Sequence, residues 1–307
     1  MIGPILLALT PIVLLIGLGH AMRRADFLPE PFWPQAERLS YFVLLPALFI
    51  HGLATADLNS VPVAPLAGAL IVSTLVVAAL LVVFSPLLAD DGPAFTSVFQ
   101  GGIRFNNYVG ITAAVGLFGP SAIALAAVAN ATIVPTVNVL CVLVFARHGT
   151  ARPTALGVLR GVALNPLVCA CVIGIALQAT GIGLPRGLEG GMKALGQAAL
   201  PLGLICVGAA LRWDALGRGM KPTIKASFAK FALMPLVTAA ACLWFGLDAR
   251  SATVAVLFQA LPTASSSYIM ARQLGGDAGL MAGIITFQTA LAMVTLPIAL
   301  LLMQAMV

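Results

Sequence analysis

A group of polar side chains interrupts the apolar run between residues 94 and 117. Four of its members can hold a charged or polar ligand, namely Gln100, Arg104, Asn106 and Asn107. Burying such groups in hydrocarbon without partners is costly, and the glycines among them weaken a helix. Broken helices at membrane depth are tolerated where they face protein or a watery cavity, and their freed backbone groups bind substrates and ions. The segment therefore predicts an interrupted span that forms part of a binding site.

A second polar group lies between residues 250 and 271. Its main members are Gln259, Pro262, Thr263 and Ser265. Pro262 lacks a backbone donor and its ring clashes with the preceding turn, so we expect the helix to break or kink there. The short hydroxyl side chains then satisfy freed carbonyls or face the cavity. Interhelical contacts and an ordinary proline kink would explain either segment alone, but two such segments at matching places in the chain favour a site.

Arg104 is the natural partner of an anionic substrate, because a guanidinium group stays charged and binds a carboxylate with two parallel hydrogen bonds. The alternative is a structural arginine that is held by carbonyls or snorkels from a span end. The ten carboxylates all fall in loops or at span ends. The sequence therefore does not favour a proton pump or an antiporter built on paired buried acids.

Other polar side chains in the apolar runs are candidates either for the cavity wall or for structure. His51 is a proton carrier or a satisfied structural histidine. Lys230 is expected to snorkel to the inner membrane surface. Asn130 and Gln288, which are 158 residues apart, line the cavity or bond to neighbouring helices. Asn138 is expected to bond between helices.

The composition predicts the elements that must position these side chains. Of the 307 residues, 61% are hydrophobic and 8% are charged, whereas a soluble domain carries about 25% charged residues. This excludes a soluble or disordered chain and indicates an all-α polytopic membrane protein. At roughly 20 residues per span, the chain holds about ten spans and no separate soluble domain. The expected spans are 3–22, 38–54, 64–89, 94–117, 121–145, 160–180, 192–211, 223–246, 250–271 and 277–303.

The distribution of basic residues predicts the orientation of these spans. The net charge is +6, but the Lys and Arg residues are scattered through loops without a basic stripe, so nucleic acid is not an expected partner. Most of them fall in the loops that are cytoplasmic when the N-terminus lies outside, which predicts that both termini are outside. The first apolar run precedes its arginines, so it is expected to be a retained span and not a secretory signal.

Three landmarks recur at nearly one offset. Leu45-Pro46 corresponds to Leu200-Pro201, Phe99-Gln100 to Phe258-Gln259, and Gly119 to Gly276, at offsets of 155, 159 and 157 residues. This pattern predicts two five-span repeats, 1–145 and 160–307, joined by a short cytoplasmic connection at 146–159. Because each repeat has an odd number of spans, the second enters the bilayer from the opposite side, an arrangement typical of secondary transporters.

The sequence resembles the auxin efflux carrier family, including its bacterial members described as malonate or organic-acid carriers. The resemblance covers nearly the whole chain, and its motifs lie at Leu44–Phe49, Arg104–Gly110, Pro201–Leu211 and Ala260–Ala264. It implies ten helices in two inverted repeats with the fourth and ninth spans broken and crossing, in a fold related to bile acid symporters and sodium/proton antiporters. It also implies a scaffold of spans 1, 2, 6 and 7, and a moving transport part of spans 3–5 and 8–10.

The resemblance assigns two site residues directly. The family's asparagine in the fourth span corresponds to Asn106, and its crossing proline in the ninth span corresponds to Pro262. Many relatives carry a proline where this chain has Thr112. The break in the fourth span therefore rests on Gly101, Gly102 or Gly110, and its exact place stays open.

These observations predict a secondary transporter that carries a small organic anion, such as a carboxylate, across the cytoplasmic membrane by alternating access. No resident cofactor is expected, and a homodimer in the lipid bilayer is compatible with the sequence. Coupling stays open between sodium (through Gln100, Gln259 and Ser265), protons (through His51 or the acid group of the substrate) and uniport. The alternatives are an anion channel and a sodium-coupled symporter of the bile-acid type. An intramembrane enzyme is disfavoured because the serines after Ala264 have no base nearby in the sequence.

Overall fold

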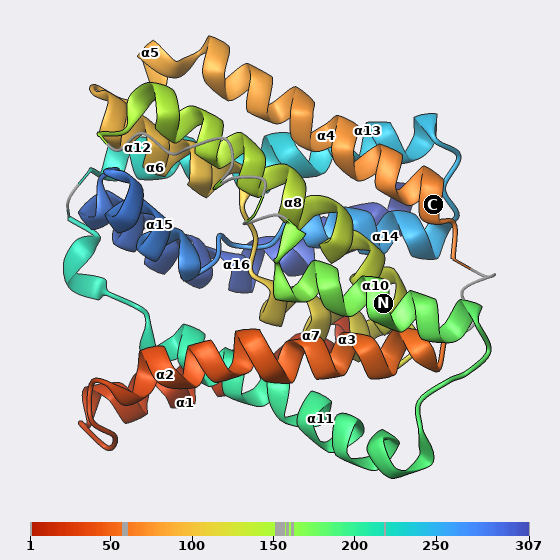
Figure 1. Ribbon diagram of the computed structural model, residues 1–307. Helices are drawn as coiled ribbons and strands as arrows, with labels where there is room; N and C mark the ends of the chain where they lie inside the picture. The colour runs from red at the N-terminus through yellow and green to blue at the C-terminus, as the bar shows by residue number, and fades with distance from the viewer. Residues whose placement is uncertain are drawn as a thin grey trace. The chain divides into compact units, whose positions relative to one another are not determined.

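The computed structural model describes residues 2–56, 61–150, 163–217 and 219–306, together with Gly157 and Arg160 (Figure 1). Every regular element within these ranges is a helix, which confirms the all-α class. The α-helices are α1 (Ile2–Arg24), α2 (Phe32–Leu39), α3 (Leu45–Ala54), α4 (Val63–Val83), α5 (Ser85–Leu88), α6 (Gly92–Ile103), α7 (Asn107–Phe118), α8 (Ala122–His148), α10 (Pro166–Ala179), α11 (Arg186–Ala209), α12 (Met220–Phe228), α13 (Met234–Trp244), α14 (Ala249–Gln259), α15 (Ser266–Leu274) and α16 (Ala278–Met306). A 3-10 turn, η3, covers Trp213–Ala215, and two π-helical turns are η1 (Ser40–Leu44) and η4 (Ala229–Leu233).

Seven helical stretches in the described residues are long and apolar enough to cross a membrane. They are Gly3–Arg24, Phe32–Ala54, Val63–Val83, Ala122–His148, Gly187–Ala209, Met220–Trp244 and Ala278–Met303. Pro166–Ala179 is apolar but shorter. The chain is therefore a multi-pass membrane protein, whereas the arrangement as ten spans in two inverted repeats stays a prediction.

The chain forms two compact units, and each unit draws on both halves of the sequence. The first unit contains residues 1–63, 107–131 and 163–210, and the second contains 64–106, 132–162 and 211–307. Much of the expected connection at 146–159 lies outside the described residues. The division into sequence repeats also stays a prediction.

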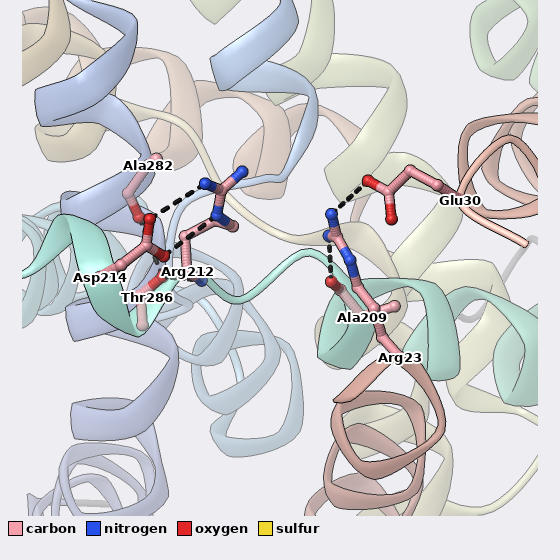
Figure 2. A network of polar contacts seen from close by, with 7 residues as sticks. All are labelled: Arg23, Glu30, Ala209, Arg212, Asp214, Ala282 and Thr286. Carbon is pink, nitrogen blue, oxygen red and sulfur yellow. Dashed lines mark hydrogen bonds and ion pairs between the residues drawn. The ribbon is translucent and has the colours of Figure 1, made fainter. Parts of the chain in front are cut away.

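Within the first unit, α1 and α11 pack with their backbones in direct contact. A methyl group added at Gly19 would collide with the carbonyl oxygen of Ile205, and one added at Gly208 would collide with that of Ile16. Small residues at such crossings let membrane helices approach closely. Arg23 then donates to the carbonyl of Ala209 at the end of α11 and pairs with Glu30 (Figure 2). A cation at the carboxyl end of a helix is favoured by the helix dipole.

Both π-helical turns precede a proline. Pro46 follows η1 and Pro235 follows η4 by two residues. A proline has no amide hydrogen, and its ring would clash with the carbonyl four residues earlier, which in both cases lies inside the π-helical turn. Widening the turn by one residue relieves that clash without ending the span.

The π-helical turn η4 places Lys230 in the interior, and the expectation that this lysine snorkels to the membrane surface is wrong. Its side chain is 0% exposed, and its Nζ has no hydrogen-bond partner among the described residues. The span begins at Met220, so at 1.5 Å per residue Lys230 lies about 15 Å along it. A side chain without exposed surface does not extend to the membrane surface, so Lys230 stays inside the protein.

Aspartates begin the two short helices that lead to the polar segments. The Asp91 carboxylate accepts from the Ala94 amide at 2.7 Å at the start of α6, and the Asp248 carboxylate accepts from the Ser251 amide at 3.1 Å at the start of α14. Burial alone would raise the pKa of Asp248, but hydrogen bonds from the Ser251 hydroxyl and backbone amides outweigh it and lower the pKa. The stabilisation from this cap is therefore present at neutral pH and is lost as the pH falls through the lowered pKa.

Replacing Asp248 with alanine is expected to destabilise the protein by about 1 kcal/mol, the usual value of an N-cap. In a chain of this size that corresponds to a fall in apparent Tm of about 2–4 °C. Thermal unfolding of the detergent-solubilised protein measures it. Asp248→Asn keeps a capping oxygen and should lose less, whereas Asp90→Ala, at an exposed position beside the other cap, should change nothing. Equal losses in all three variants would contradict the capping role.

Candidate functional site

Both predicted interruptions are present in the helices. α6 ends at Ile103 and α7 begins at Asn107, with Arg104 in an extended conformation (φ −76°, ψ 162°). α14 ends at Gln259 and α15 begins at Ser266. Thr112 lies inside α7, where its hydroxyl donates to the Tyr108 carbonyl at 2.7 Å. The first break, whose place the sequence left open, thus follows Gly101 and Gly102 directly and does not occur at Gly110.

The two interruptions contact each other within the second unit. The backbone amide of Asn106 donates to the carbonyl of Pro262 at 2.9 Å. Gln288 of α16 joins the same two segments through its side chain. Its Nε2 donates to the Gly101 carbonyl at 3.0 Å, and its Oε1 accepts from the Thr263 amide, also at 3.0 Å. One fully buried side chain therefore satisfies a freed carbonyl at the end of α6 and a freed amide after Pro262.

Thr263 completes the buried link between the interruptions. Its hydroxyl lies 3.4 Å from the Gln100 carbonyl and 3.2 Å from the Ser267 hydroxyl. The Thr263 side chain is fully buried. The short hydroxyl thus takes up a carbonyl near the end of α6, as the polar pattern predicts for helices broken inside a membrane.

Gln259 and Gln100, which correspond in the proposed repeats, have different surroundings. The Gln259 amide nitrogen donates to the Thr74 hydroxyl of α4 at 2.8 Å, with the Ser73 hydroxyl and the Leu70 carbonyl at 3.4 Å. Both side-chain polar atoms of Gln100 are buried and have no hydrogen-bond partner in the described ranges. A buried amide without partners is costly, so it marks a place where a further polar group belongs.

Among the described residues, the hydrogen-bond partners of the Arg104 side chain are neutral. Its Nη1 donates to Asn138 Oδ1 of α8 at 3.0 Å and lies 3.3 Å from the Met270 sulfur, and its Nη2 donates to the Ser266 hydroxyl at 3.2 Å. Its Nε is buried with no partner among the described residues. The ion pairs among the described residues are Arg23–Glu30 and Arg212–Asp214, and neither of them includes Arg104 (Figure 2). Arg104 therefore places an uncompensated positive charge beside the first residue of α15.

The structure separates the predicted site residues into two sets. The second unit contains Gln100, Arg104, Asn106, Gln259, Pro262, Thr263, Ser265 and Gln288. The first unit contains Asn107, Asn130 and His51. Asn130 donates to the Ala126 carbonyl of its own helix at 2.8 Å. The Asn107 Oδ1 and the His51 Nε2 are buried and have no hydrogen-bond partner in the part of the chain that the structure describes.

Three partners of Arg104, namely Asn138, Ser266 and Met270, were not among the predicted site residues. Asn138 was expected to bond between helices, and it does so, but nothing in its position identified Arg104 as its partner. Ser266 was expected only to satisfy a carbonyl or face a cavity. The serine run after Pro262 was the available signal, because a serine hydroxyl can accept a hydrogen bond from a guanidinium group of another segment.

Comparison with known proteins identifies the family of the chain. A family model described as "Membrane transport protein" matches residues 4–300 and so includes both interruptions. A protein of Rhizobium meliloti (strain 1021) named "Putative malonate transporter" is 26% identical over 277 residues, which cover 85% of this chain and 84% of the relative. The family model matches this multi-pass membrane chain, with its two helices broken at buried polar segments, over nearly its full length. The chain therefore belongs to the membrane transport protein family, of the auxin efflux carrier type, and is a membrane transporter.

Proposed function

We propose that this protein is a secondary transporter of small organic anions that carry a carboxylate, with its binding site at the two interrupted helices. The observation that carries the proposal is the Arg104 guanidinium, whose partners Asn138, Ser266 and Met270 are all neutral. A guanidinium in a protein interior needs an anionic companion, and a carboxylate fits its planar fork with two hydrogen bonds. An anionic substrate supplies the missing charge.

The helix ends at the site add to the preference for an anion. Arg104 reaches the Ser266 hydroxyl at the first residue of α15. The amino end of a helix carries a partial positive charge, which disfavours a cation there and favours an anion. An arginine beside such an end is stable when a negatively charged group lies between them.

The proposed transport cycle is alternating access in a fold of ten spans. The ten are the seven long helices, the shorter α10 and the two interrupted pairs, α6 with α7 and α14 with α15. The caps at Asp91 and Asp248, 157 residues apart, support two repeats, because they add a fourth pair at the offset of the sequence landmarks. Spans 3–5 and 8–10 then move against spans 1, 2, 6 and 7 and expose the bound anion to each side in turn. Both termini lie on the outer side of the cytoplasmic membrane in this proposal.

Counterflow in proteoliposomes tests this function. Vesicles loaded with unlabelled malonate, the substrate in the relative's name, are diluted into trace labelled malonate, and other mono- and dicarboxylates are tried in the same way. A carrier accumulates label transiently, and excess external carboxylate competes. Absence of counterflow with every carboxylate, or single-channel steps in planar bilayers, would overturn the proposal. Counterflow that requires sodium on both sides would instead support a sodium-coupled symporter of the bile-acid type.

A further inference from the structure

Lys230 is a buried amine that the proposed binding site does not use. It lies in η4, its side chain is 0% exposed, and its Nζ has no hydrogen-bond partner in the described residues. An ammonium group removed from water without a partner is strongly disfavoured, and the group gives up its proton instead. The structure therefore fits a neutral amine at this position.

The helices around Lys230 offer no acid to pair with it. In the described residues, η4 packs against α6, α12 and α13, and Gly102 of α6 lies beside Ala229. α6 has no titratable side chain, although Arg104 follows it. α12 has Lys221 and Lys225, and α13 has Cys242. The described carboxylates of the second unit are confined to helix ends and loops, at Asp90, Asp91, Asp214, Asp248 and Asp277.

The turn η4, which contains Lys230, packs against α6, and the predicted repeats relate this packing to that of α14. Gln259 of α14 donates to Thr74 and lies near Ser73 in the third predicted span. Gln100 corresponds to Gln259 at an offset of 159, and Ser73 corresponds to Lys230 at an offset of 157. In the predicted repeats, Gln100 and Lys230 therefore hold the positions that correspond to Gln259 and Ser73, and η4 packs against α6. The side chains of Gln100 and Lys230 both have buried polar atoms without hydrogen-bond partners in the described ranges.

We propose that Lys230 carries the proton that couples anion movement to a pH gradient. This inference rests on the proposed transport function. The amine is neutral while it is buried and no anion is bound. When the transport part opens to one aqueous side, water reaches Lys230 and the lone pair of Nζ takes up a proton from it. The positive charge then accompanies the anion, and the proton returns to water on the other side as the anion leaves. Proton binding is linked to hydration and to anion binding because the charged amine is stable only where water or the bound anion compensates its charge.

The test uses proteoliposomes with the membrane potential clamped at zero, in which malonate accumulation is followed at several imposed pH gradients. With one proton per anion, a gradient of one pH unit that is alkaline inside supports about tenfold accumulation in the wild type, since each tenfold ratio of protons balances a tenfold ratio of anion. Lys230→Met is expected to keep malonate counterflow, which moves no net proton, and to lose the gradient-driven accumulation. Lys221→Met, at an exposed position of α12, is the matched control and should behave as the wild type.

Four results would overturn the role of Lys230. The first is gradient-driven accumulation that persists in Lys230→Met, which would assign the proton to the acid group of the substrate. The second is loss of coupling in His51→Gln with retention in Lys230→Met. The third is a weaker apparent affinity of Lys230→Met for malonate with unchanged coupling, which would make the lysine a counter-charge. The fourth is net malonate uptake by the wild type, driven by an imposed malonate gradient, without proton uptake in a pH-dye assay, a measurement that needs no variant to fold. Absence of wild-type counterflow with every carboxylate would refute the transport function itself and is thus distinguishable from all four.

Discussion

Arg104→Gln is expected to reduce the apparent affinity for malonate in counterflow by at least about a hundredfold, because removing one partner of a buried ion pair costs about 3–5 kcal/mol. Glutamine can still bond to Asn138 or Ser266, so the fold around the interruption should survive. What disappears is the charge that balances the carboxylate. Because the neighbours of Arg104 are neutral, no other described group at this point replaces it.

Two further variants separate charge from geometry at this site. Arg104→Lys keeps the charge but loses the planar fork, so an intermediate loss of affinity is expected. Arg272→Gln removes an exposed arginine of the same helix, α15, and should leave transport unchanged. Wild-type affinity in Arg104→Gln, measured by competition in counterflow, would show that Arg104 is structural and that the anion binds elsewhere.

Gln288→Leu is expected to destabilise the protein by roughly 2–6 kcal/mol, because it leaves two buried backbone groups without partners at about 1–3 kcal/mol each. These groups are the Gly101 carbonyl and the Thr263 amide, which Gln288 now satisfies together. The two interrupted helices lose a side chain that joins them, so transport should fall as well. Thermal unfolding in detergent measures the first effect and malonate counterflow the second.

The neighbouring Thr289 provides the matched control for Gln288. Its side chain is 2% exposed, and its hydroxyl has no hydrogen-bond partner in the described residues. Thr289→Val keeps the shape and removes only the unpaired hydroxyl, so it should leave stability equal or slightly higher. If Gln288→Leu and Thr289→Val unfold at the same temperature, the bridge does not contribute to stability.

The two interruptions could be predicted from the sequence because each has a local cause. Pro262 breaks a helix wherever it lies in one, and Arg104 with its polar neighbours cannot remain unpaired in hydrocarbon. The place of the first break could not be fixed, because Gly101, Gly102 and Gly110 weaken a helix equally. The tertiary contacts of Gln288 and Asn106 determine which of these positions opens.

The hydrogen-bond partners of these side chains in other parts of the fold could not be predicted from the sequence for a similar reason. An asparagine in an apolar span, such as Asn138, indicates a bond to another helix but does not identify that helix. The Lys230 prediction failed because it assumed a charged group near a span end would reach the surface. The structure begins that span at Met220 and widens it at η4 ahead of Pro235, so the lysine lies deep inside.

The bond between the Asn106 amide and the Pro262 carbonyl uses main-chain atoms alone. In the proposed binding site, a substitution at position 106 that keeps the backbone amide therefore changes the side chain while this tether persists. The substrate of such a transporter can then change in evolution through a few side-chain substitutions, while the backbone structure that holds these side chains is kept. Divergent relatives that share this tether are expected to differ in their substrates far more than in their backbones.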